Sequence, residues 1–338
     1  MPEGLSVPLI AILVLAVVFD YINGFHDTAN AIATSVSTRA LKPEHAIVLS
    51  ATANFLGALT GTAVATTIGA GLVNESLISS HDPHLTYIAA ALVGAILWNL
   101  LTWRLGIPSS SSHALIGGLL GATMIAADFG AIKVQGVFDK VLVPLVTSPI
   151  LGLIIGFGLM VLMMNVFVRA NPRRLNERFR RLQLLSAAYM AFSHGSNDAQ
   201  KTMGVITLAL FSSGVIPEFK VPIWVIFIAA GAMSFGTASG GWRIIKTMGQ
   251  RVVKLDPIHG FAAETTAATI IFGASHFGMP VSTTHVISSA IMGVGSSSRL
   301  SAVRWGVAGN IVTAWILTIP ASAIAAALAY LLVRPLLG

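Results

Sequence analysis

The chain has 338 residues, of which 55% are hydrophobic and only 10% are charged, whereas a soluble domain carries about 25% charged residues. Its net charge of +7 arises from basic residues in short loops between long apolar runs. We interpret this as the positive-inside pattern of a membrane protein and exclude nucleic acid as a partner. The lack of cysteine excludes disulfides and thiolate metal sites.

Long apolar runs along the chain predict the membrane spans. The first run, 7–18, has neither the basic flank nor the small-residue cleavage site of a signal peptide, so we expect it to be retained. Further runs follow, and several reach the about 20 residues that a helix needs to cross the hydrocarbon core. They lie at 47–68, 88–101, 141–168, 221–235 and 303–333. The sequence therefore predicts an all-α, polytopic transmembrane protein.

Two motifs recur along the chain in the same order. Gly24–Asp27 returns as Gly195–Asp198 at an offset of 171 residues, and Pro108–His113 returns as Pro280–His285 at an offset of 172. Nearly equal offsets predict two related halves. In each half we expect a broken helix, a second helix, two segments flanking the proline motif, and a long final helix.

The halves are predicted to be transmembrane repeats of opposite orientation. We place them at 8–168 and 183–334, joined by a basic linker at 169–182 that contains six arginines. An odd number of crossings in the first half inverts the second, which gives the inverted-topology repeat common in secondary transporters. The segments around the proline motifs are expected to form re-entrant hairpins, although periodicity also allows spanning helices. Loop charges predict a cytoplasmic linker and both termini outside.

The first motif predicts a cation site. Ionisable groups inside a membrane are functional candidates by default, and glycine followed by small polar residues is expected to break the helix and free backbone carbonyls. Together with Asp27 and Asn30, these carbonyls would supply oxygen ligands to a small cation. The second motif offers Asn197 and Asp198, with Lys201 at the position of Asn30. The alternative is that these side chains only cap the broken helix ends.

The proline motifs predict an anion site. Proline is favoured at the first position of a helix, so Ser109–Ser112 and Ser282–Thr284 are expected to gather hydroxyls and free N–H groups at two helix N-termini, where anions bind. Serines in membrane helices also pack or bond to their own backbone, which is the alternative. An anion beside membrane carboxylates requires a cation, so the two sites together predict cation–anion symport, with phosphate suiting the hydroxyls.

At these residues the sequence resembles the inorganic phosphate transporter family, in its bacterial low-affinity branch. The glycine–aspartate motifs and the proline–hydroxyl–histidine motifs all match, and the resemblance covers essentially the whole chain. It implies a secondary transporter, not an enzyme, that imports inorganic phosphate by cation symport and alternating access. It also implies a homodimer surrounded by lipid in the cell membrane, the inner membrane of a bacterium.

The resemblance and the motifs together assign residues to two roles. Substrate binding is assigned to Ser110, Ser111, Ser112, Ser282, Thr283, Thr284, Asn197 and Lys201. Cation binding or coupling is assigned to His26, Asp27, Asn30, Asp198 and Glu264. His26 and Lys201 depart from the general family motif and leave protons and sodium both open as the coupling ion. No cofactor or resident metal is expected; whether a divalent cation accompanies the phosphate is left open.

Other functions are weighed against this one. Sulfate or another tetrahedral oxyanion is the alternative substrate; sulfate has no proton to donate, whereas protonated phosphate suits the acceptors Asp27, Asp198 and Glu264. An intramembrane metalloenzyme is disfavoured because the sequence contains no metal-ligand motif such as His-Glu-x-x-His. His81 and His84 lie in a predicted loop, where they are expected to be solvated surface residues. A passive channel is disfavoured by inverted repeats.

Four further ionisable residues of the apolar segments remain without an assigned role: Asp20, Arg104, His113 and His285.

Overall fold

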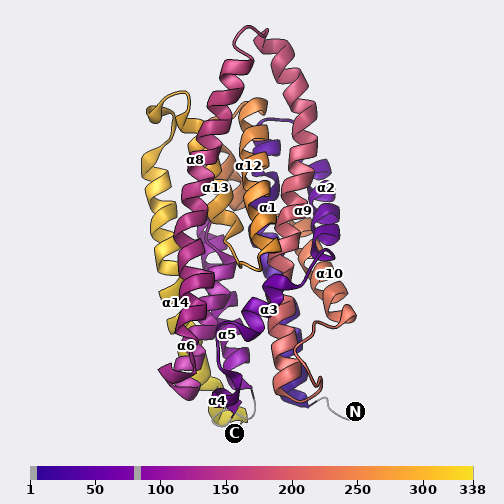
Figure 1. The fold of residues 1–338 in the computed structure, drawn as a ribbon, viewed down its shortest axis with the longest axis vertical. Helices are drawn as coiled ribbons and strands as arrows, with labels where there is room; N and C mark the ends of the chain where they lie inside the picture. The colour runs from indigo at the N-terminus through magenta and orange to yellow at the C-terminus, as the bar shows by residue number, and fades with distance from the viewer. Residues whose placement is uncertain (1–5, 80–84, 338) are drawn as a thin grey trace.

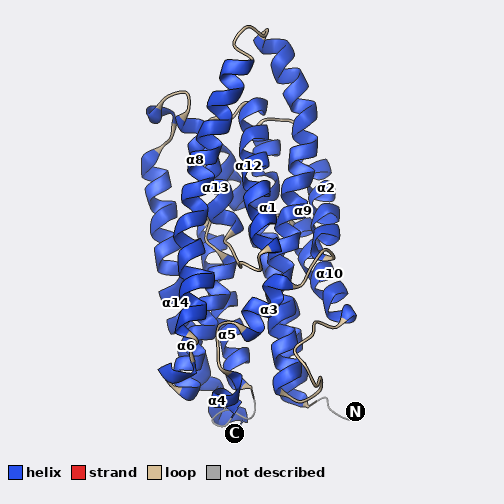
Figure 2. Ribbon diagram, viewed as in Figure 1, coloured by secondary structure: helices blue, strands red, loops and turns tan. Residues whose placement is uncertain are grey.

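The chain forms an elongated bundle of helices (Figures 1 and 2). This computed structural model describes residues 6–79 and 85–337, and within those ranges it contains helices but no β-strand apart from an isolated bridge between Val73 and Ile132. The predicted all-α class is confirmed. His81 and His84 lie outside the described residues.

The helices follow the predicted order in both halves. The first half contains α1 (Val7–Ser37), α2 (Pro43–Ala58), α3 (Ala63–Ala70), α4 (Glu75–Ser79), α5 (Thr86–Leu105), α6 (Ser111–Ala127), α7 (Val134–Val137) and α8 (Val143–Val166). The second contains α9 (Pro172–Ser212), α10 (Ile223–Ser239), α11 (Trp242–Lys246), α12 (Pro257–His276), α13 (Thr283–Ser296) and α14 (Trp305–Leu337). Short 3₁₀ or π turns lie at Phe129–Ala131, Phe138–Leu142, Thr247–Arg251 and Leu300–Ala302.

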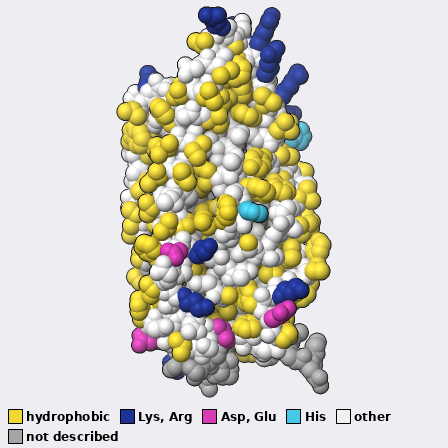
Figure 3. Space-filling view, in the orientation of Figure 1, with side chains coloured by type: hydrophobic (Ala, Val, Ile, Leu, Met, Phe, Trp, Pro, Cys, Tyr) yellow, Lys and Arg dark blue, Asp and Glu magenta, His cyan; other side chains and the backbone are white. Residues whose placement is uncertain are grey.

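Several of these helices are long and apolar enough to cross a membrane. The described residues include four such helices, and up to six spans if α2 with α3 and α10 with the segment 242–251 each count as one bent span. Apolar side chains are spread along the length of the face shown in Figure 3, and Lys and Arg gather at the end that carries the α8–α9 connection. The protein is therefore a multi-pass membrane protein.

The first and last long helices of the two halves run in opposite directions: α1 runs opposite to α9, and α8 runs opposite to α14 (Figure 1). In Figure 1 the α8–α9 connection lies at one end of the long axis, and the start of α1 and the end of α14 lie at the other. This is the arrangement that an inverted repeat would produce, although the repeat and the membrane side of each end stay predictions. Most of the predicted linker is helical, because α9 begins at Pro172 after the N-cap Asn171.

The predicted break at the glycine–aspartate motifs is wrong. α1 continues through Gly24 and α9 through Gly195 without interruption; the bends lie elsewhere, between α2 and α3 (71°) and after α10 (60°). The glycines instead allow close packing of helix backbones. A Cβ at Gly24 would lie 2.2 Å from the carbonyl oxygen of Met233 on α10, and one at Gly195 would lie 2.1 Å from that of Asn54 on α2.

Two separate apolar clusters enclose a polar layer. One cluster includes apolar residues of α1 between Leu9 and Phe19 and of α9 between Ala199 and Leu210. The other includes apolar residues of α1 between Ala29 and Ala33 and of α9 between Phe179 and Ala191. Between these stretches both helices carry buried polar side chains. The polar centre is therefore held away from water by the same two helices that supply its residues.

Replacing Gly236 with alanine tests the close contact between α10 and α1. The added Cβ would lie 2.1 Å from the Tyr21 carbonyl oxygen, so we expect the free energy of unfolding to fall by about 1–3 kcal/mol. Gly231→Ala on the same helix is the matched control, because no atom lies within 4 Å of its added Cβ. Thermal denaturation of the detergent-purified chain measures both variants. Equal midpoints for the two would contradict the contact.

Candidate functional site

A buried ion pair on α9 lies at the centre of the site. Asp198 and Lys201 are separated by three positions, so they share one face of the helix. The Lys201 ammonium donates to Asp198 Oδ1 and to Ser112 Oγ, and at 3.1 Å to the Val281 carbonyl oxygen. All three donors of the ammonium are thereby used. Both side chains are fully buried, where an unpaired charge would cost several kcal/mol.

The hydroxyls of the second proline motif join this ion pair to α1. Thr283 Oγ1 donates to Asp198 Oδ2 at 3.0 Å. Asn30 Nδ2 on α1 donates to Thr284 Oγ1 at 2.9 Å and to Thr283 Oγ1 at 3.3 Å. One connected network therefore links α1, α9 and the start of each helix that follows a proline motif. It brings together six of the predicted site residues: Asn30, Ser112, Asp198, Lys201, Thr283 and Thr284.

A second group of side chains in the polar layer has the composition of a cation site. Asp27, His194 and Asp198 are all buried, and each offers one ligand atom within 4.8 Å of the others. His194 Nδ1 lies 3.1 Å from Asn54 Oδ1 and donates to it, since an amide oxygen only accepts. The other ring nitrogen lies 3.1 Å from Asp198 Oδ2, close enough for an ion pair when the imidazole is protonated. In the neutral ring, with Nδ1 donating to Asn54, the lone pair of Nε2 is available on the carboxylate side as a ligand for a cation.

His26 holds Asp27 in place. Its Nδ1 donates to Asp27 Oδ1 at 2.6 Å, and its Nε2 lies 3.1 Å from Thr102 Oγ1 and 3.5 Å from Ser109 Oγ. The imidazole therefore connects the α1 carboxylate to the end of α5 and the first proline motif. His26 therefore orients the Asp27 carboxylate, which is a predicted cation ligand.

Serines in the two proline motifs act as helix caps, in the turn between α5 and α6 and in the turn between α12 and α13, which we call the hairpin tips. The predicted placement of proline at the first helical position is wrong, because α6 begins at Ser111 and α13 at Thr283. Ser110 Oγ accepts from the His113 backbone N–H at 3.1 Å, and Ser282 Oγ accepts from that of His285 at 3.2 Å. A serine N-cap satisfies a free donor that proline cannot. Ser111 Oγ, by contrast, is buried and has no hydrogen-bond partner among the described residues.

The two hairpin tips meet through their histidines. The rings of His113 and His285 have centroids 4.8 Å apart, and His285 also stacks on Trp315 at 4.0 Å. Asn197 secures the second tip, because its Nδ2 donates to Ser275 Oγ at 2.9 Å and to the Met279 carbonyl oxygen at 3.1 Å. Its Oδ1 has no partner among the described residues.

Glu264 lies outside the central network, in a polar cluster of its own. It accepts from Thr34 Oγ1 at 2.5 Å, Gln183 Nε2 at 3.1 Å and Ser186 Oγ at 2.5 Å. Thr34 lies one helical turn beyond Asn30 on α1. The structure therefore places Glu264, a predicted coupling residue, next to the central network along α1. No hydrogen bond between described residues joins Glu264 to Asp27 or to Asp198.

Asp20 and Arg104, whose roles were open, occupy opposite environments. Asp20 is fully buried, and neither carboxylate oxygen has a hydrogen-bond partner among the described residues; Asn23 and Thr202 face it. Arg104 is exposed at the end of α5, where its carbonyl oxygen accepts from Arg243 Nη1 at 2.7 Å. Arg104 is not part of the site.

Sequence reasoning missed several polar partners, chiefly His194 in the cation group and Gln183 and Ser186 around Glu264. The pattern that reveals His194 is its position four residues before Asp198, on the same helix face. An ionisable residue inside an apolar span is a candidate by the rule that selected Asp27. Gln183 and Ser186 precede the repeated motif and carry no comparable pattern.

Comparison with known proteins shows the family of the chain. A family model described as the phosphate transporter family matches residues 23–176 and 168–326. The chain belongs to the phosphate transporter family.

Similar proteins cover nearly the whole chain. A probable low-affinity inorganic phosphate transporter of Bacillus subtilis is 48% identical over 96% of this chain and 97% of its own length. One of Rhizobium meliloti is 47% identical over 98% of each. A solved structure described as the sodium-dependent phosphate transporter is 26% identical, with a TM-score of 0.84 over 97% of this chain and 99% of that one. These relatives are described as transporters, not as enzymes.

A double-mutant cycle tests the buried ion pair. Lys201→Met leaves the Asp198 carboxylate buried without its partner, so we expect a loss of about 3–5 kcal/mol in unfolding free energy. Asp198→Asn likewise leaves the Lys201 ammonium buried without its carboxylate partner. The double variant should lose less than the sum of the two single losses, because neither charge remains. Lys246→Met, at an exposed lysine, is the control. Strictly additive losses, measured by thermal denaturation, would show that the pair does not interact.

Proposed function

We propose that this chain imports inorganic phosphate together with a cation, by alternating access. The observation that supports this most strongly is that an anion-binding group and a cation-binding group of side chains lie next to each other in the buried polar layer. Hydroxyls from the two proline motifs converge on the Lys201–Asp198 pair, Ser112 on the ammonium and Thr283 on the carboxylate, and the cation group of Asp27, His194 and Asp198 lies beside them. The first group suits an oxyanion and the second suits a cation.

The anion would bind at the hairpin tips. Ser111 Oγ is buried and has no partner in the part of the chain that the structure describes, and Ser112, Thr283 and Thr284 present hydroxyls close to the N-termini of α6 and α13. Helix N-termini favour anions through their free N–H groups and dipoles. Lys201 supplies the one full positive charge of this network. A phosphate that reaches it would replace Ser112 or Asp198 as a partner of the ammonium.

The cation would bind among Asp27, His194 and Asp198. If phosphate draws Lys201 away from Asp198, the carboxylate needs another positive charge. Two unit charges 4 Å apart interact by about 4 kcal/mol at an effective dielectric constant near 20, which is enough to couple both occupancies. Protons and sodium are the coupling ions that the sequence leaves open. The imidazole of His194 also suits a divalent metal ion, which supports cargo in the form of metal–phosphate.

Orientation and assembly rest on the sequence. The gathering of Lys and Arg at the α8–α9 end supports a cytoplasmic placement of that end. The homodimer and the bacterial inner membrane follow from the family resemblance.

Uptake of labelled phosphate into proteoliposomes tests the proposal. Proton and sodium gradients are imposed separately, each with and without a divalent cation, and sulfate is added as a competitor. We expect at least one gradient to drive uptake and excess sulfate to leave it largely unchanged. Gradient-independent equilibration would contradict symport, and sulfate uptake that excess phosphate does not reduce would favour the alternative substrate.

The cation ligands are tested by Asp27→Asn and Asp198→Asn. Each should lower gradient-driven uptake by about tenfold or more, since tenfold corresponds to only about 1.4 kcal/mol of lost binding. Asp139→Asn, at an exposed aspartate, should transport like the unaltered protein. Normal uptake in either site variant would remove that carboxylate from the mechanism.

A further inference from the structure

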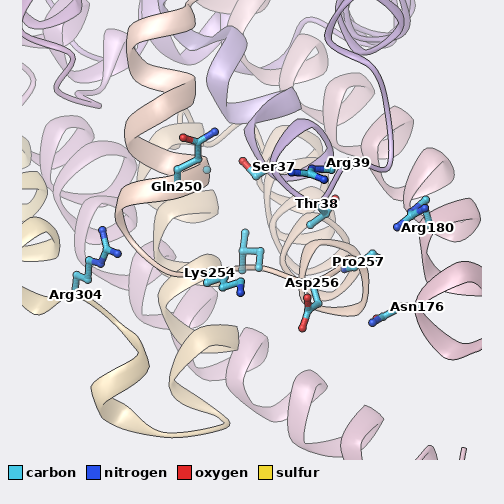
Figure 4. Close-up of a pocket in the computed structure, with 12 residues that line it drawn as sticks. Ser37, Thr38, Arg39, Asn176, Arg180, Gln250, Lys254, Asp256, Pro257 and Arg304 are labelled. Atoms are coloured by element: carbon cyan, nitrogen blue, oxygen red, sulfur yellow. The ribbon is translucent and has the colours of Figure 1, made fainter. Parts of the chain in front are cut away.

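A basic cavity lies outside the central site, at the end of the molecule that carries the α8–α9 connection. It has a volume of about 480 Å³ and is lined by the end of α1, the first part of α9, the segment 249–257 and Arg304. Figure 4 shows the cationic side chains Arg39, Arg180, Lys254 and Arg304 around it, together with Asp256. These residues come from four separate parts of the chain.

No residue in the described ranges 6–79 and 85–337 neutralises the four cations. Arg39, Arg180, Lys254 and Arg304 are exposed, and none of their side chains forms an ion pair or hydrogen bond with another described residue. Asp256 is the one carboxylate in the lining, and it lies 4.0 Å from His259 instead. A concave surface lined by one sign of charge concentrates the potential and attracts counter-ions.

The positive-inside rule explains how many basic residues occupy this end, but not why four of them surround a cavity. Other basic residues of the same connection, such as Arg173 and Arg178, do not line it. The convergence is therefore a separate feature of the fold.

The lining selects the chemistry of a ligand. Arginine binds phosphate oxygens through a planar, bidentate fork, and three of the four cations are arginines. The cavity volume falls within the about 300–1,000 Å³ typical of small-molecule sites. Four cations and one carboxylate leave a net positive charge of three. This charge suits an anion with two or more linked phosphate groups better than a single orthophosphate.

We propose that this cavity is a cytoplasmic binding site for an anion containing linked phosphate groups, separate from the transport site. Its location connects it to the polar cluster around Glu264, which lies next to the central network along α1. Thr38 in the lining donates to Gln183 Oε1 at 2.7 Å, and Gln183 donates to Glu264, which also accepts from Thr34. An occupant bridging Arg39 on the α1 side to Arg180 on α9 would hold these helices together. This consequence rests on the proposed function: such an occupant would slow transport.

Binding is tested without transport, on the purified full chain. Because the sequence has no cysteine, Gln250→Cys places a single thiol in the cavity lining, and its reaction with a hydrophilic maleimide is timed. Pyrophosphate or tripolyphosphate should slow labelling at concentrations where orthophosphate, or sodium chloride of equal ionic strength, does not. Glu177→Cys, exposed on α9 outside the lining, should show no protection.

Two further arms decide the outcome. In the Gln250→Cys background, Arg39→Gln with Arg304→Gln should raise the concentration needed for protection by about tenfold or more. ATP compared with tripolyphosphate distinguishes a nucleotide from a condensed phosphate as the occupant. No protection by any of these anions, or equal protection in the arginine variant, would overturn the proposal.

The effect on transport is measured separately, in vesicles loaded with pyrophosphate. Loading should slow phosphate uptake by the unaltered chain by severalfold and leave the Arg39→Gln, Arg304→Gln variant unaffected. Both proteins should take up phosphate alike in unloaded vesicles. Protection without any effect on uptake would leave the binding site in place and overturn its regulatory role. Failure of phosphate transport itself would not alter the labelling result.

Discussion

The buried charges of Asp198 and Lys201 set the requirement that the rest of the centre meets. They lie between two apolar clusters, where water cannot compensate them. The ammonium has three donors and all three are engaged, with Asp198, Ser112 and the Val281 carbonyl. An anion that binds Lys201 must therefore displace a partner. If that partner is Asp198, the carboxylate needs a new positive charge, and a cation that enters beside Asp27 and His194 supplies one. The binding of the two ligands would therefore be coupled, because Lys201 has no spare donor for the anion and Asp198 has no second positive charge beside it among the described residues.

Much of the fold is predictable from the sequence, because apolar length and repeated motifs are local properties. The all-α class, the order of helices and the two helices that flank each proline motif all agree with the structure. The position of the helix breaks was not predictable in the same way. A glycine in an apolar helix fits either a break or a close contact, and only the neighbouring helix decides. Gly24 and Gly195 face backbone carbonyls of α10 and α2, so α1 and α9 stay continuous.

The site was predictable where residues share one helix face or one motif. Asp198 and Lys201 are three positions apart, and the hydroxyls of the proline motifs meet them as the anion argument expects. Partners from distant segments were not predictable: Glu264 receives hydrogen bonds from α1 and α9, and Ser110 and Ser282 serve as caps. The roles of these residues in transport remain predictions. What the structure adds is which charges are already paired before any ligand arrives.

Equilibrium binding of phosphate to the purified chain, measured over a range of coupling-cation concentrations, tests the central claim most directly. If the ligands share Asp198 and Lys201, the cation should tighten phosphate binding by about 5–150-fold, and phosphate should tighten cation binding by the same factor. Lys201→Met should abolish this reciprocity. A phosphate affinity that stays constant from the lowest to the highest concentration of every candidate cation would contradict the account, since two ligands that bind independently do not share these charges.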